Sequence, residues 1–215
     1  MLNRRHLRIR VLQALYAWQK NPEKDLAKAE KAFLKSLQEV EELYTFLLLY
    51  LLELRDYAAN FIEESKIKRL PTQEDLNPNT KFIDNLFLNV LKDHTNLLTL
   101  ADAYKLSYVG QEEMVKKIFF KLIETQEYQE YMGVENQDFE SDKKFVSKIF
   151  GKFLVEQDHF QHLLEEKNIH WDDDLPFISS MVVKTIKDSQ QGKIHLMSLF
   201  KDKEDKQFCL VLFRK

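Results

Sequence analysis

The chain has 215 residues and a net charge of −3, and this length suffices for one large domain or two small ones. Hydrophobic residues make up 44% of it, including 16 Phe, which excludes a disordered protein. Only 4 Gly and 4 Pro are present, too few for a turn-rich β architecture, so the composition predicts an all-α protein built as a multi-helix bundle.

The first twenty residues predict an amphipathic helix that begins with basic side chains. Arg4, Arg5 and Arg8 lie three or four positions apart, so we expect them on one solvated side of the first turns. Asn3 is the expected N-cap, and the helix is expected to end before Pro22. Apolar residues recur every three or four positions and form the expected buried face: Leu7, Val11, Leu15 and Trp18.

The charge of this helix is unusual, because cations at a helix N-terminus oppose the helix dipole. Five Lys and Arg and no acid lie in the first twenty residues, whereas the other 27 of the 32 cations are outnumbered by all 35 Asp and Glu. A single basic patch on an acidic body indicates a localised anionic partner, and guanidinium groups match phosphate oxygens. The alternative is a solvated basic N-terminus without a ligand.

The next stretch, from Asp25 to Lys68, has helical apolar spacing and contains no Gly or Pro. It predicts one very long helix, or two with a break at 35–39, packed into a bundle. The run Phe46–Leu52 is apolar on every side, which predicts a position at the centre of the core. Because this run is far too short to cross a bilayer, and the single Cys fits a reducing compartment, we expect a cytoplasmic protein with no membrane partner.

The predicted domain boundaries follow the prolines. A segment at 71–80 with two Pro predicts a linker after a first region at 1–70. Helical periodicity resumes across 81–200, with single helices expected over 82–104 and 112–131.

Later helices are expected to start after Ser141 and at the acidic triplet 172–174. Residues 201–215 begin one more amphipathic helix, whose apolar residues predict an exposed, unfinished face. We therefore expect the full protein to continue beyond Lys215. The residues of that face are Phe208, Leu212 and Phe213.

No pattern predicts catalysis. His159 and His162 lie one helical turn apart, a spacing that can bind a metal ion, but no third ligand has a recognisable spacing. The four glycines are isolated, so they form no phosphate-binding loop, and neither a nucleophile elbow nor a cofactor fingerprint is present. We expect no catalytic residue, no cofactor, no metal and no enzyme activity.

Two aromatic side chains follow the basic residues. An aromatic ring near a basic patch can stack on an unpaired RNA base. Trp18 is in register with Val11 and Leu15, which favours the core, whereas Tyr16 is off that stripe and fits either the core or an RNA site.

The sequence Arg4-Arg5-His6-Leu7-Arg8, followed by Leu12-Gln13-Ala14-Leu15-Tyr16-Ala17-Trp18, resembles the arginine-rich first helix of the NusB transcription antitermination factors. The resemblance implies an all-helical fold and binding of the single-stranded boxA element in ribosomal RNA leader transcripts. It also implies as partners the ribosomal protein NusE and the RNA polymerase antitermination complex.

Carried over by position, Arg4, Arg5 and Arg8 would contact RNA phosphates and Tyr16 would lie beside the RNA. Arg10 stands outside the motif but adds positive charge, so it is a further candidate RNA contact. Ile9 replaces the acid that the family has after its third Arg, which makes this helix more positive than the family pattern.

The rest of the chain departs from the family. Residues 25–200 resemble a long helical insertion between the first two family elements, and 208–215 resembles the start of the next one. The family's C-terminal segment, which carries much of the surface that contacts NusE, does not occur in the sequence. Two other functions stay open: a helical scaffold whose basic end docks an acidic protein, and the RNA-docking domain of an RNA methyltransferase.

Overall fold

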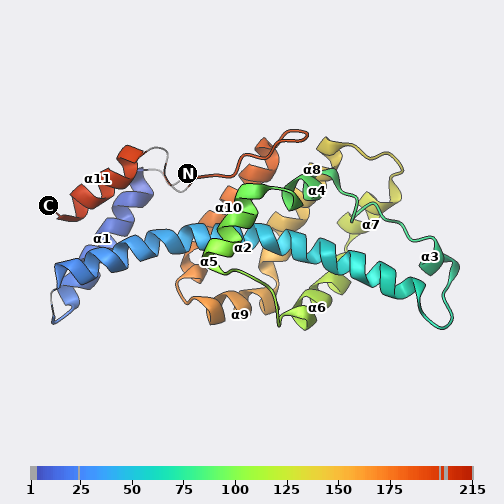
Figure 1. Ribbon diagram of the computed structural model, residues 1–215, viewed down its shortest axis with the longest axis horizontal. Coiled ribbons are helices and arrows are strands. Elements are labelled where there is room, and N and C mark those ends of the chain that lie inside the picture. Colours follow the sequence, from blue (N-terminus) through green and yellow to red (C-terminus); the bar gives the residue numbers. More distant parts are fainter. Residues whose placement is uncertain (1–3, 24, 199, 201–202, 215) are drawn as a thin grey trace. The chain divides into compact units, whose positions relative to one another are not determined.

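The structure is a computed structural model that describes residues 4–23, 25–198, 200 and 203–214 (Figure 1). Asn3, the expected N-cap, lies outside these residues, as does the side chain of Arg5. The described residues form helices, with one isolated bridge between Gln190 and Lys193 and no strand, which confirms the all-α prediction. The elements are α1 (Arg4–Lys20), α2 (Leu26–Lys66), α3 (Gln73–Leu76), α4 (Leu86–Lys92), α5 (Thr95–Tyr104), α6 (Glu112–Ile123), α7 (Gln126–Gly133), α8 (Phe139–Lys152), the 3-10 turn η1 (Leu154–Glu156), α9 (Asp158–Lys167), α10 (Trp171–Asp188) and α11 (Lys203–Arg214).

The chain divides into two compact units. Unit 1 comprises Met1–Leu43 and Met197–Lys215, and unit 2 comprises Tyr44–Leu196. The junction at 43–44 lies inside α2, which is one continuous helix, without the break considered at 35–39. The linker at 71–80 and the boundary at 200 stay predictions.

An aromatic cluster forms the centre of unit 2. The ring of Phe46 stacks on Tyr108 with 4.3 Å between centroids, and the Tyr108 hydroxyl donates to the Phe46 carbonyl at 2.9 Å. The Tyr50 ring stacks on Phe160 at 4.0 Å, and Trp171 lies 5.4 Å from Phe46. All the residues of the apolar run except the half-buried Leu49 are buried, which confirms the predicted core.

Two predicted helices are each interrupted by a cap. The helix expected over 112–131 is divided into α6 and α7, because Thr125 Oγ1 accepts from the Tyr128 amide at 3.2 Å and starts a new helix. The helix expected over 82–104 is likewise divided into α4 and α5, where His94 caps the second helix. Sequence periodicity missed both breaks, since the apolar spacing continues across them.

A buried carboxylate joins three helices of unit 2. Asp142 of α8 is fully buried and accepts hydrogen bonds from the Leu86 amide at 2.7 Å, the Tyr131 hydroxyl at 2.7 Å and Gln137 Nε2 at 2.9 Å. Burial, followed by the hydrogen bond to Asp142, raises the pKa of Tyr131 well above its usual range. Tyr131 therefore remains a donor at any physiological pH.

A local pH effect is expected at the cap of α3. The Thr72 amide and then the Lys68 ammonium hold the pKa of Asp75 at about 2, below its usual 3.8. Asp75 stabilises this cap above pH 3.8, and the contribution is lost as pH falls through 2. We expect Lys68→Met to raise the pKa of Asp75 towards 3.8 in an NMR titration, whereas Lys66→Met, which removes a partner of Glu63 instead, should leave it unchanged. Equal pKa values in both variants would contradict this assignment.

Candidate nucleic-acid interface

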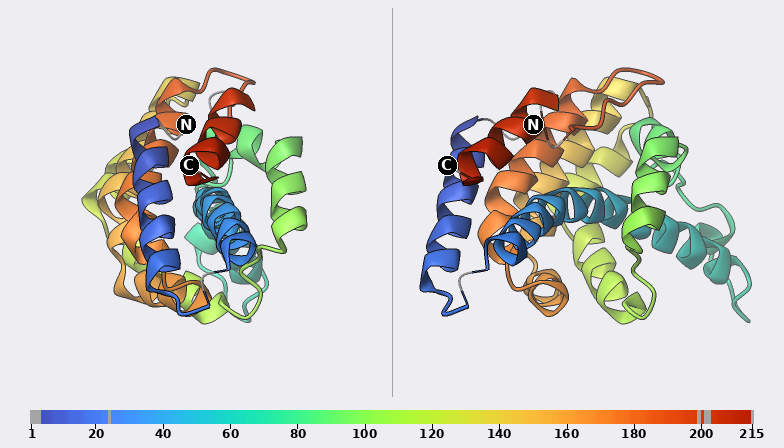
Figure 2. Two further views of the ribbon diagram at one scale, coloured as in Figure 1. Left: turned by 90° about the vertical axis from the view of Figure 1, so that its left-hand side faces the viewer. Right: turned by 60° about the vertical axis from the view of Figure 1, so that its left-hand side comes forward.

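Within unit 1, α1 packs on α11, and the two helices lie side by side in Figure 2 (dark blue and red). Leu7 and Val11 are buried, as their spacing predicted, while Trp18 is half-buried. The other described side chains of α1 are exposed or half-buried.

The prediction that the last helix, α11, has an exposed apolar face is wrong. Phe213 is 2% exposed because its ring stacks on Phe33 of α2, with 5.3 Å between centroids, and Phe208 and Leu212 are half-buried. On the same helix Arg214 binds Glu30 of α2 through two hydrogen bonds of 2.8 and 2.5 Å. The stripe is thus covered by helices from the other end of the chain, which periodicity alone does not reveal.

Two residues of α11 hold the first arginines of α1. The guanidinium groups of Arg4 and Arg8 lie over the Phe208 ring, 5.5 and 5.7 Å from its centroid. Arg4 Nε also donates to Asp205 Oδ1 at 3.0 Å, although the Arg4 side chain stays 57% exposed. These contacts restrict the two arginines to defined orientations. The sequence does not predict that Asp205 and Phe208 contact these arginines, because they lie about two hundred positions away in the chain.

The predicted RNA contacts are not equivalent in the structure. Arg8 is exposed, whereas Arg10 is half-buried. The side chain of Arg5 lies outside the described residues. The predicted solvated arginine side of α1 is therefore occupied by Arg8, with Arg4 held against α11.

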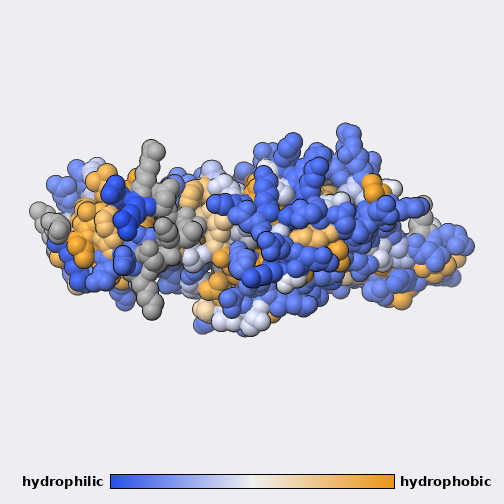
Figure 3. Space-filling model, turned by 90° about the horizontal axis from the view of Figure 1, so that it is seen from above, coloured by the Kyte–Doolittle hydropathy of each residue, from blue (hydrophilic) through white to orange (hydrophobic). Residues whose placement is uncertain are grey.

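The exposed face of α1 continues past the arginines. Arg8, Leu12, Tyr16 and Lys20 are all exposed and follow each other one turn apart. Tyr16 is 61% exposed, so of its two predicted positions the structure favours the surface, and Lys20 Nζ lies 5.5 Å from its ring centroid. In a space-filling view, hydrophobic residues gather on part of the surface of unit 1 (Figure 3).

A small cavity lies beside Tyr16. Its volume is about 400 Å³, and its walls come from the second half of α1: Leu12, Leu15, Tyr16, Trp18 and Gln19. On α1, the Tyr16 ring and the cavity therefore lie between the arginines of the first turns and Lys20 in the last turn. The first turn of α1 contains no acid. This arrangement can bind phosphate groups at its start and a planar, partly apolar group at its end.

The other candidate chemistry does not assemble. His159 and His162 are both exposed, and in the described part of the chain no three His, Cys, Asp or Glu side chains lie close enough to hold a metal ion. Among the same residues, no helix is both long and apolar enough to cross a membrane.

Comparison with known proteins gives no relative: no family model, no curated protein and no solved structure matches this chain.

Proposed function

We propose that α1 binds single-stranded RNA, and that the protein acts as a NusB-like transcription antitermination factor. The proposed ligand is a boxA-type element of a ribosomal RNA leader transcript. The proposed partners are the ribosomal protein NusE and the RNA polymerase antitermination complex, which places the protein in the cytoplasm. The observation that supports the proposal is the succession of exposed guanidinium, aromatic ring and cavity along one helix face.

Each side chain has a distinct role in this proposal. Arg8 and Arg4 neutralise consecutive phosphates, and Phe208 and Asp205 position their guanidinium groups. Tyr16 stacks on an unpaired base, as exposed aromatic side chains do in proteins that bind single strands. Arg10, being half-buried, adds to the positive field without needing a direct contact.

A second candidate function is docking of an acidic protein. Ile9 and Leu12 favour it, because they expose apolar surface next to the arginines, with Leu12 68% exposed. A protein partner such as NusE and an RNA strand can also bind to different parts of α1 at the same time. RNA remains the better ligand for the part of the face around Tyr16, where a planar ring borders a cavity.

Salt dependence tests the phosphate contacts. A fluorescent boxA-like oligonucleotide should bind the full chain with log affinity falling against log salt at a slope of about −2, the value for three phosphate contacts on a single strand, here those proposed for Arg4, Arg5 and Arg8. Arg8→Ala should lower the affinity about tenfold and make this slope shallower. Lys31→Ala on the exposed side of α2 is the control and should change neither quantity. A flat salt response would exclude phosphate binding.

Stacking is tested separately at Tyr16. Tyr16→Ala should weaken RNA binding about tenfold, since stacking of a base on an aromatic ring is worth about 1–3 kcal/mol, and should leave the salt slope unchanged. Tyr16→Phe keeps the ring and should bind within about twofold of the original chain. If both variants bind equally well, the ring does not contact RNA, and docking of an acidic protein becomes the better explanation of the basic helix.

A further inference from the structure

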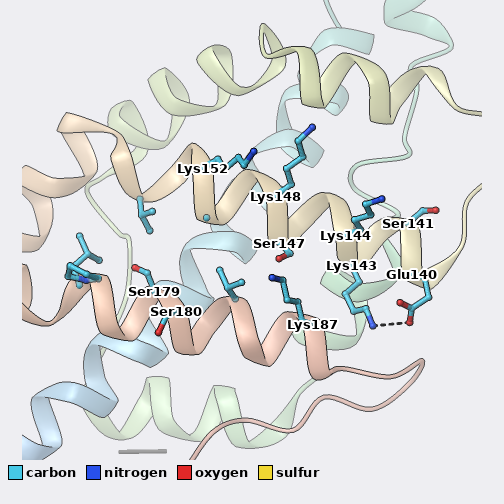
Figure 4. Close-up of a pocket in the computed structure, with 15 residues that line it drawn as sticks. Glu140, Ser141, Lys143, Lys144, Ser147, Lys148, Lys152, Ser179, Ser180 and Lys187 are labelled. Carbon is cyan, nitrogen blue, oxygen red and sulfur yellow. Dashed lines mark hydrogen bonds and ion pairs between the residues drawn. The ribbon is translucent and has the colours of Figure 1, made fainter. Parts of the chain in front are cut away.

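A groove runs between α8 and α10 of unit 2, far along the sequence from the basic helix. The two helices pack side by side, and a hollow of about 1100 Å³ that is open to solvent lies between them. In Figure 4, Lys143, Lys144, Lys148 and Lys152 extend from α8, and Lys187 extends from α10. Neither the composition nor the periodicity of the sequence predicts that these lysines lie together.

The floor of the groove is made of small and apolar side chains. Ser147 and Gly151 of α8 face Ser179 and Val183 of α10. A Cβ atom at Gly151 would lie 3.4 Å from Val183 Cγ2, an ordinary van der Waals contact, so the small residue at 151 leaves room above the floor rather than relieving a clash. Leu175 and Pro176 add apolar surface at one end. The hollow therefore offers space for bulky apolar side chains from outside.

One polar atom in the floor is unsatisfied. Ser179 Oγ is buried, and it makes no hydrogen bond with any described residue. A buried hydroxyl without a partner costs about 1–3 kcal/mol. Its position beside the hollow is consistent with a site whose complement comes from another molecule.

The rim is strongly basic. Five lysines and one acid, Glu140, line the groove. Lys143 is fixed by Glu140 at 2.8 Å and by the Ser189 carbonyl at 3.0 Å, so it is part of the scaffold. Lys144, Lys152 and Lys187 are exposed and line the groove, whereas Lys148 lies 3.5 Å from Glu127 of α7. This basic rim contrasts with the chain as a whole, whose net charge is −3.

We propose that this groove binds an acidic amphipathic helix of a partner protein. Its length, about four helical turns, suits a third helix laid along α8 and α10, with apolar anchors in the floor and acids against the lysines. Among the described residues that line it, none is aromatic and none is Arg, whereas recognition of single-stranded RNA depends on both. The proposal is independent of RNA binding by α1.

The test uses designed peptides as probes. A fluorescent peptide of about 16 residues, with Leu at helical spacing and Glu flanking that stripe, is titrated against the full chain by anisotropy. It should bind at least about tenfold more tightly than a shuffled peptide of the same composition or a Lys-for-Glu version. Its affinity should fall with added salt, because the rim charges are exposed.

Matched variants locate the binding. Lys144→Glu combined with Lys187→Glu reverses two rim charges and should weaken the acidic peptide about tenfold, while Lys117→Glu with Lys184→Glu, exposed lysines that do not line the groove, should change it less than about twofold. Gly151→Leu fills the hollow without touching a charge and should also weaken binding about tenfold. Arg8→Ala should have no effect.

Several outcomes would overturn the proposal. No measurable binding of the acidic amphipathic peptide, equal binding of the shuffled peptide, or equal loss in the rim and control variants would each do so. Loss of RNA binding in the rim variant, with peptide binding unchanged, would make the groove a nucleic-acid site instead. Circular dichroism melts confirm that these surface variants remain folded.

Discussion

Phe46→Ala is expected to lower the free energy of unfolding of unit 2 by about 3–5 kcal/mol. The Phe46 ring is fully buried and contacts three other rings, those of Tyr108, Phe160 and Trp171. Its removal leaves a cavity at the point where α2, α9 and α10 meet the segment before α6, and several stacking contacts are lost together. Urea unfolding followed by Trp171 fluorescence measures the effect in a Trp18→Phe background, where Trp171 is the remaining indole of the 2 in the chain.

Two controls accompany this prediction. Val109→Ala, at a side chain 86% exposed on the segment next to Tyr108, should change the free energy of unfolding by less than about 0.5 kcal/mol. Phe46→Leu keeps most of the volume and should cost less than Phe46→Ala. A loss below about 1 kcal/mol for Phe46→Ala would show that the ring cluster is not the core of unit 2.

Asp142→Ala is expected to cost about 3 kcal/mol, although it removes one small side chain. The substitution removes the acceptor of the half-buried Leu86 amide and the carboxylate that the buried Tyr131 hydroxyl binds at 2.7 Å. It also removes one of the two acceptors of Gln137 Nε2, an exposed side chain that still donates to the Asp84 carbonyl at 3.0 Å. These donors belong to α4, α7 and the loop before α8, so their loss loosens three segments at once. Guanidinium unfolding of the variant and of Glu140→Ala, an exposed acid two residues earlier, provides the comparison.

A double-mutant cycle isolates one of these bonds. Tyr131→Phe removes the hydroxyl while keeping the ring, which stacks on Phe145 with 3.9 Å between centroids. The coupling between Tyr131→Phe and Asp142→Ala should be about 1 kcal/mol or more. A coupling near zero, or an equal cost for Glu140→Ala, would contradict the role of Asp142.

The core of unit 2 could be predicted because it is encoded locally. The run Phe46–Leu52 has no polar side, so any helical fold must bury it, and the structure does. The breaks at Thr125 and His94 could not be predicted, since each depends on one side chain that accepts a backbone hydrogen bond at a point where the apolar period continues.

Only the part of the candidate RNA site that lies on α1 could be predicted. The arginines and Tyr16 lie within one helix, and their spacing gives their relative positions. Asp205 and Phe208, which orient two of those arginines, come from another helix. The basic groove was missed because its lysines belong to two helices, and its depth depends on small residues such as Gly151, which carry no signal by themselves.

Unit 1 is formed by two segments that lie far apart in the sequence, and this has a consequence for biosynthesis. Arg4 and Asp205 are separated by 201 positions, whereas unit 2 is a single continuous stretch. Closing so long a loop is entropically costly, so unit 2 should form first and unit 1 later. At translation rates of about 5–20 residues per second, α1 leaves the ribosome roughly 10–40 s before α11 can cover Leu7 and Val11. The helix α1 is therefore made well before the surface that it shares with α11 is complete.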